Sequence, residues 1–118
     1  PLPGHTAKPV IVQFAQGDLT VPNPTTTAIL RAGGLADRAT RFRNDLAYAV
    51  NSAMGKNPHT FLSNIGNGVQ APYAVMAQTQ MAIFFATGGA LTIDPDGAAG
   101  PFFEVPTLAL PEGLNFIP

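Results

Sequence analysis

Residues 9–22, PVIVQFAQGDLTVP, join a short apolar run to a polar turn. The run Val10–Phe14 is rich in β-branched residues, too short for a helix and soon followed by Gly17, so it predicts a buried strand. Asp18 comes directly after that glycine, where the strand would reach the surface. Open α/β sheets assemble their sites at the carboxyl ends of their strands, which makes Asp18 a candidate functional residue. The alternative is that Asp18 only begins a turn, as aspartate often does.

The composition is typical of one packed, loop-rich domain. The chain has 118 residues, of which 46% are hydrophobic and 11% charged, with 12 glycines and 12 prolines. The net charge is -1 and the basic residues form no stripe, so neither nucleic acid nor an anionic membrane surface is an expected partner. No apolar run approaches the roughly 18 residues of a membrane-spanning helix. Cysteine is absent, which excludes disulfides, thiolate metal sites and a cysteine nucleophile.

A first helix is expected over residues 24–32. Asn23 suits the N-cap, because its side chain can accept a hydrogen bond from a free N–H, and Pro24 suits the first helical position. The helix should end at the glycine pair 33–34, where glycine favours the left-handed terminating conformation. Its buried side is expected to comprise Ala28, Ile29 and Ala32.

The residues that follow predict a second strand and a longer helix. Residues 38–44 alternate, with Arg41 and Arg43 opposite Phe42, which is typical of a half-exposed edge strand with a solvated basic face. Residues 45–56 allow a short helix. A helix over 73–87 is expected to bury an apolar stripe at helical spacing, comprising Tyr73, Met76, Ala77, Gln80, Met81, Phe84 and Phe85.

Residues 89–118 are expected to form an irregular tail or a loose hairpin. The runs 90–93 and 102–105 are strand-like and flank a connection rich in glycine and proline. Asp94 and Asp96 within it are similar to the first half of a calcium loop. The later ligands of such a loop do not follow at the required spacing, so we expect no bound calcium, and no other metal or cofactor is indicated.

The chain has two histidines, and their surroundings differ. His59 follows Pro58 in a loop, and the apolar Phe61 and Leu62 can anchor that loop on the core, so the ring could be held in a defined place. The alternative is an ordinary surface histidine. His5 lies among prolines and glycine near residue 1 and is expected to be solvated.

Asp18 and His59 follow predicted strands in the order acid, then histidine. Gly17-Asp18-Leu19-Thr20-Val21-Pro22 is close to the frequent acid motif of the α/β-hydrolases, in which Asp and two further residues precede Val-Pro. With the intervening helix and strand, residues 9–87 resemble the C-terminal part of such an enzyme, nearest to exported bacterial lipases and esterases. The resemblance implies that residues 1–88 form strand, helix, strand, loop and helix of an α/β-hydrolase sheet, with residues 89–118 as the tail.

The resemblance also implies a chemistry. Asp18 would orient the ring of His59, and His59 would act as general base and then general acid in a catalytic triad. The reaction would be hydrolysis of a small ester or lipid through an acyl-enzyme. Low charge, absent cysteines and the lack of an initiator methionine lead us to expect a secreted or cell-envelope protein.

The nucleophile of that chemistry is missing. The only serines, Ser52 and Ser63, do not stand in a Gly-x-Ser-x-Gly sequence. We therefore expect the serine on an N-terminal chain or fragment of the same hydrolase, for example a product of proteolytic processing. Its strands would complete the sheet, because parallel sheets are stable when both faces are covered. Two alternatives stay open: a non-catalytic structural or interaction protein on a hydrolase-like scaffold, and an independent small binding domain.

Overall fold

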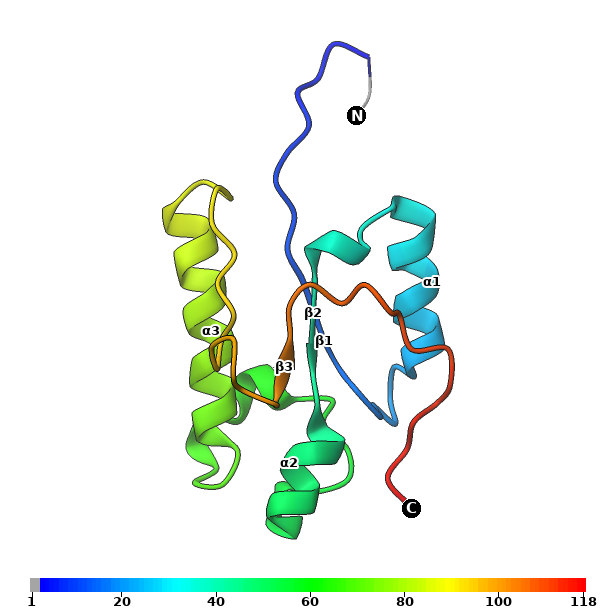
Figure 1. The fold of residues 1–118 in the computed structure, drawn as a ribbon, viewed down its shortest axis with the longest axis vertical. Helices are drawn as coiled ribbons and strands as arrows, with labels where there is room; N and C mark the ends of the chain where they lie inside the picture. Colours follow the sequence, from blue (N-terminus) through cyan, green and yellow to red (C-terminus); the bar gives the residue numbers. More distant parts are fainter. Residues whose placement is uncertain (1–2) are drawn as a thin grey trace.

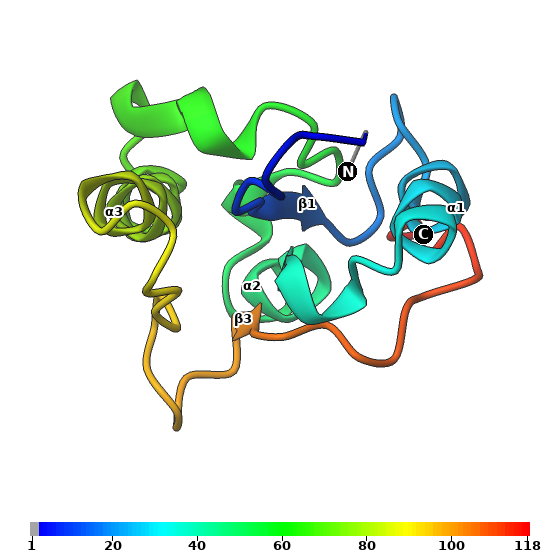
Figure 2. The ribbon, with the colours of Figure 1, turned by 90° about the horizontal axis from the view of Figure 1, so that it is seen from above.

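The computed structural model describes residues 3–118, in which a small mixed sheet separates two helical layers (Figures 1 and 2). The strands are β1 (Val12–Ala15), β2 (Ala39–Phe42) and β3 (Phe103–Glu104), in that order across the sheet. β1 runs parallel to β2, with Val12 opposite Ala39, and β3 runs antiparallel to β2. The chain is thus α/β, as its sequence predicts.

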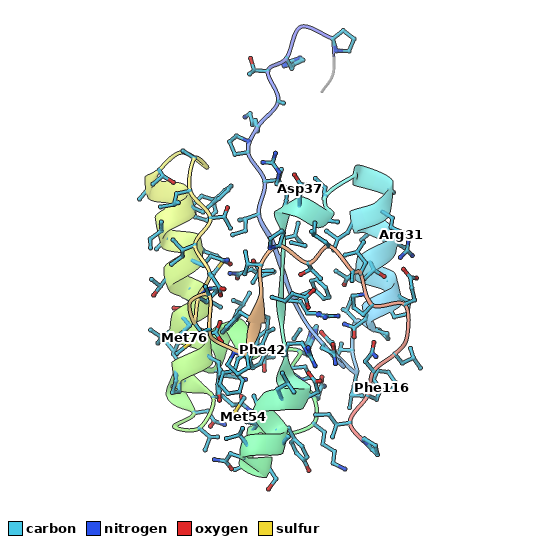
Figure 3. The ribbon with its side chains drawn as sticks, in the orientation of Figure 1. Arg31, Asp37, Phe42, Met54, Met76 and Phe116 are labelled. Carbon is cyan, nitrogen blue, oxygen red and sulfur yellow. The ribbon has the colours of Figure 1, made fainter. Side chains whose placement is uncertain are left out.

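The strand residues alternate between two apolar clusters, one on each face of the sheet. Phe14, Leu30 and Ala39 form a small cluster under α1 (Asn23–Gly33). Ala15 and Phe42 belong to a larger cluster beneath α3 (Ala71–Ala86), where Phe42 lies between the sheet and that helix (Figure 3). Because side chains of a strand alternate between faces, the four-residue strands β1 and β2 contribute side chains to both clusters.

The prediction for the first helix is correct in its extent and wrong in its buried side. Its N-cap is Pro22, not Asn23, and it ends at the left-handed Gly34. Ile29 is 65% exposed, and Ala28 and Ala32 are also exposed. The buried stripe instead consists of Asn23, Thr27 and Leu30. The cause is the hydrogen bonding of Asn23 to the turn after β1, which rotates that stripe toward the sheet.

The prediction of an edge strand at residues 38–44 is wrong, because β2 is the central strand of the three. The expected hairpin of runs 90–93 and 102–105 is also wrong: residues 90–93 form no strand, and β3 pairs with β2. Phe103 stabilises this pairing, because its ring packs against that of Phe42 in the core, with 5.3 Å between the ring centroids. Arg41 is consequently half-buried and forms an ion pair with Glu104 across the strands.

The remaining elements are one short helix and three 3-10 turns. The possible short helix after β2 exists as α2 (Asn44–Val50), and three 3-10 turns occur at Ala36–Arg38, Ser52–Met54 and Phe61–Gly66. In α3 the expected face is largely buried, but Phe85 is 70% exposed. None of the helices within residues 3–118 has the length and apolar character needed to cross a membrane.

The end of the chain forms a strap across the α1 face of the sheet. Thr107 is fully buried and donates its N–H to the carbonyl of Ala39 at 2.9 Å. Leu110 then packs on the small cluster, and Glu112 forms an ion pair with Arg31 of α1. The tail is irregular, as predicted, and it covers part of the sheet that α1 leaves open.

Candidate functional site

A tight turn follows β1 and is fixed by one buried side chain. Asn23 accepts a hydrogen bond from the Gly17 N–H and donates one to the Ala15 carbonyl, both at 2.9 Å. Gly17 has a φ of 80°, and a Cβ there would lie 2.6 Å from the carbonyl oxygen of Asn115 in the strap. Only glycine fits these two conditions, so the turn presents the next residue, Asp18, in a defined position.

Asp18 is held by both of its carboxylate oxygens. Oδ1 accepts the N–H groups of Thr20 at 2.7 Å and Val21 at 2.8 Å, while Oδ2 lies 2.9 Å from Nδ1 of His59. Burial by itself raises the pKa of Asp18. The hydrogen bonds from Val21, His59 and Thr20 oppose it and hold that pKa below its ordinary value. The carboxylate is therefore ionised at neutral pH.

His59 comes from a loop that is anchored on the core directly after it. Phe61 donates its N–H to the carbonyl of the buried Pro58 at 2.9 Å, and its ring stacks on Phe42 at 5.1 Å. The His59 side chain is 40% exposed, and among residues 3–118 its second ring nitrogen, Nε2, has no hydrogen-bond partner. The sequence-predicted anchor is therefore present, and the ring that it holds is partly exposed.

The carboxylate of Asp18 determines which nitrogen of the His59 ring carries the hydrogen. An ionised carboxylate at Nδ1 favours the tautomer in which Nδ1 bears hydrogen, so Nε2 keeps its lone pair. A ring so oriented can accept a proton at Nε2 while the carboxylate stabilises the imidazolium that forms. The geometry suits a general base.

A cavity of about 190 Å³ adjoins the pair at the outer edge of β1. Its polar wall includes Asp18 and His59. Apolar residues from the strand, the turn and the 3-10 segment form the rest, among them Phe14, Val21, Phe61 and Leu62. The pair thus forms part of the wall of a small, partly apolar space.

The two serines and His5 make no hydrogen bond to this pair among residues 3–118. Ser63 donates its hydroxyl to the carbonyl of Thr60 at 3.0 Å, and Ser52 begins a 3-10 turn. His5 is exposed. Within residues 3–118, no three histidine, aspartate or glutamate side chains come together in a way that could hold a metal ion.

Sequence reasoning missed two asparagines that organise the site. Asn23 was assigned to the N-cap, and Asn57 was not singled out. In the structure Asn57 contacts both the Asp18 turn and the His59 loop. Asparagine beside proline and glycine often bonds main-chain groups, which is a signal for such residues but does not identify their partners.

No protein-family model matches the chain, and comparison with curated proteins and with solved structures gave no significant match.

Proposed function

We propose that Asp18 and His59 are the acid and base of a serine hydrolase that cleaves carboxylic esters through an acyl-enzyme. The observation that carries the proposal is the 2.9 Å contact between Asp18 Oδ2 and His59 Nδ1, with the carboxylate fixed by two further N–H groups. In this proposal the chain is the C-terminal part of an α/β-hydrolase, and its Asp18 motif supports that assignment.

The proposed reaction uses His59 twice. Nε2 takes the proton of a serine hydroxyl as the serine oxygen attacks the ester carbonyl, and Asp18 stabilises the imidazolium. The ring then gives this proton to the departing alkoxide, which leaves as an alcohol, and the acyl group remains bonded to the serine oxygen. In the second half a water molecule loses a proton to Nε2 as its oxygen attacks the acyl group, and the ring then gives this proton to the departing serine oxygen, which releases the carboxylic acid and restores the serine hydroxyl.

The ester preference and the location are also proposals. The resemblance of the Asp18 motif to exported bacterial lipases and esterases supports a small ester or lipid substrate and a secreted or cell-envelope protein. The apolar residues around the cavity are compatible with an acyl chain.

We propose that the serine belongs to an N-terminal chain or fragment of the same hydrolase. The open edge of β1 supports this, since within residues 3–118 no strand pairs there. Gln16 donates its N–H to Phe42 of β2, so the alternating main-chain groups of Gln13 point to the opposite edge. An added strand would satisfy these groups and would lie next to the acid–base pair.

A fluorophosphonate probe, which reacts with an activated serine, tests the proposal on the native protein. Changing His59→Ala should reduce the rate of labelling by about 10⁴-fold or more, because the general base is lost. His5→Ala is the matched control and should leave the rate unchanged. Peptide mapping of the labelled protein should locate the probe on a Gly-x-Ser-x-Gly serine outside these 118 residues. Labelling that is unaffected by His59→Ala would contradict the proposal and favour a non-catalytic scaffold.

A further inference from the structure

Asn57 connects the two loops that carry Asp18 and His59. Its Oδ1 accepts the N–H of Leu19 and the N–H of His59, both at 3.2 Å. Its Nδ2 donates to the hydroxyl of Thr20 at 3.4 Å. One carboxamide therefore contacts the two residues after the acid and the main chain of the base.

The contact to His59 alone would be ordinary, because an asparagine often caps the N–H two residues ahead of it. The bond to Leu19 differs, since 38 residues separate the two in the sequence. Asn67 provides a comparison within the chain: its Oδ1 also accepts two N–H groups, from Val69 and Gln70, and both are local. Unlike Asn67, Asn57 uses this pattern to join two loops that are distant in the sequence.

We infer that Asn57 is a positioning residue that sets the distance between the carboxylate of Asp18 and the ring of His59. This inference rests on the proposed function. A carbonyl oxygen has two lone pairs, so the two N–H donors use its full capacity and fix both loops to one point. Thr20, held through its hydroxyl, is the residue whose N–H bonds Asp18 Oδ1. Loss of Asn57 therefore loosens the acid as well as the base.

Labelling of the native protein by the fluorophosphonate tests this role. Asn57→Ala should lower the labelling rate about tenfold, because small displacements of catalytic groups are costly. Asn67→Ala, which removes the local version of the same bonds, should change the rate by less than twofold. Asn57→Asp keeps the acceptor oxygen and should label faster than Asn57→Ala when each variant is measured at its own pH optimum.

Two NMR measurements separate positioning from general stability. In Asn57→Ala the pKa of Asp18, followed by its carboxyl ¹³C signal, should move up toward the ordinary value, and the His59 ring ¹⁵N signals should show less of the Nδ1–H tautomer. Asn67→Ala should leave both unchanged.

The outcomes distinguish the positioning role of Asn57 from the proposed function of the pair. If His59→Ala abolishes labelling but Asn57→Ala labels like the native protein, the positioning role is wrong and the proposed function stands. If His59→Ala is labelled as fast as the native protein, the proposed function fails. A shifted pKa of Asp18 in Asn57→Ala would still show that Asn57 sets the geometry of the pair. Unchanged NMR signals in Asn57→Ala would overturn the positioning role.

Discussion

The turn after β1 and the loop before β3 each place aspartate beside glycine, but they treat the carboxylate in opposite ways. Asp18 receives two main-chain N–H groups and the ring of His59, and its pKa is lowered. Burial raises the pKa of Asp94, and the adjacent carboxyl of Asp96 raises it further. In the same loop the buried Oδ1 atoms of Asp94 and Asp96 have no hydrogen-bond partner among residues 3–118.

The difference shows that hydrogen-bond donors can outweigh burial: burial raises the pKa of both groups, and only at Asp18 do the donors bring it below the ordinary value. A carboxylate that accepts several hydrogen bonds stays ionised even where it is shielded from water, whereas one that faces another carboxylate tends to keep its proton. A histidine that becomes positively charged is oriented and stabilised by an ionised carboxylate. Of the two loops, only the Asp18 turn meets that requirement.

The largest expected effect is on the rate of fluorophosphonate labelling, compared between the same substitution in the two loops. Asp18→Asn keeps the size of the side chain but removes the charge and can present an N–H to Nδ1, which favours the wrong tautomer of His59. Fluorophosphonate labelling of the native protein should slow by about 10⁴-fold. Asp94→Asn, the same change in the other loop, should leave labelling within twofold. Equal effects of the two substitutions would contradict the assignment of Asp18 as the acid.

A second pair of substitutions compares the glycines of the two loops. Gly17 and Gly97 both have positive φ, 80° and 77°, but a Cβ at Gly17 would meet the Asn115 carbonyl at 2.6 Å while one at Gly97 meets nothing within 4 Å. Gly97→Ala should lower the free energy of unfolding by about 1 kcal/mol, the cost of the backbone conformation. Gly17→Ala should cost about 2–3 kcal/mol, because the strap must also move. Urea unfolding measures the free energy of unfolding of both variants. Similar losses of stability would mean that the strap moves away from residue 17 at little cost.

The pairing at the site could be predicted, and the packing around it only in part. Gly17 followed by Asp18 marks the end of a buried strand, and Pro58 with Phe61 marks an anchored loop, so local sequence makes both residues candidates. That they pair is what the resemblance of the Asp18 motif to the α/β-hydrolases implies. The burial of Asn23 and the exposure of Ile29 depend on how the helix docks, which helical periodicity alone does not determine. The central place of β2 depends on Phe103, a distant residue whose pairing leaves no local pattern. Asn57 was missed for the same reason, since Asn-Pro-His has the appearance of an ordinary turn.

A smaller effect is expected in the acidic loop itself. Asp94→Asn replaces a carboxyl that faces Asp96 with an amide that can donate a hydrogen bond to it. The free energy of unfolding at pH 7 should rise by about 1 kcal/mol. Thermal and urea unfolding of the native protein measure the change, with Asp37→Asn on the exposed surface as the control. A loss of stability would show that the charge of Asp94 serves the fold.

The smallest effect, and the most direct comparison, is how the two aspartates change stability with pH. Asp18 has a lowered pKa in the folded state, so the unfolded chain binds the proton more readily. The stability that Asp18 contributes is present above its unfolded pKa of about 4 and is lost as the pH falls through the folded value. Asp94 has a raised pKa, so the folded chain binds the proton more readily, and stability declines as the pH rises from about 4 through that value. Urea unfolding between pH 3 and 8 should show a destabilisation by Asp18→Asn that grows up to about pH 5 and then levels off, and a stabilisation by Asp94→Asn that grows as the pH rises from about 4, each by less than about 1 kcal/mol per pH unit. If both differences shrink as the pH rises, the hydrogen-bond donors do not lower the pKa of Asp18, and Asp18 loses the property that suits it to orient His59.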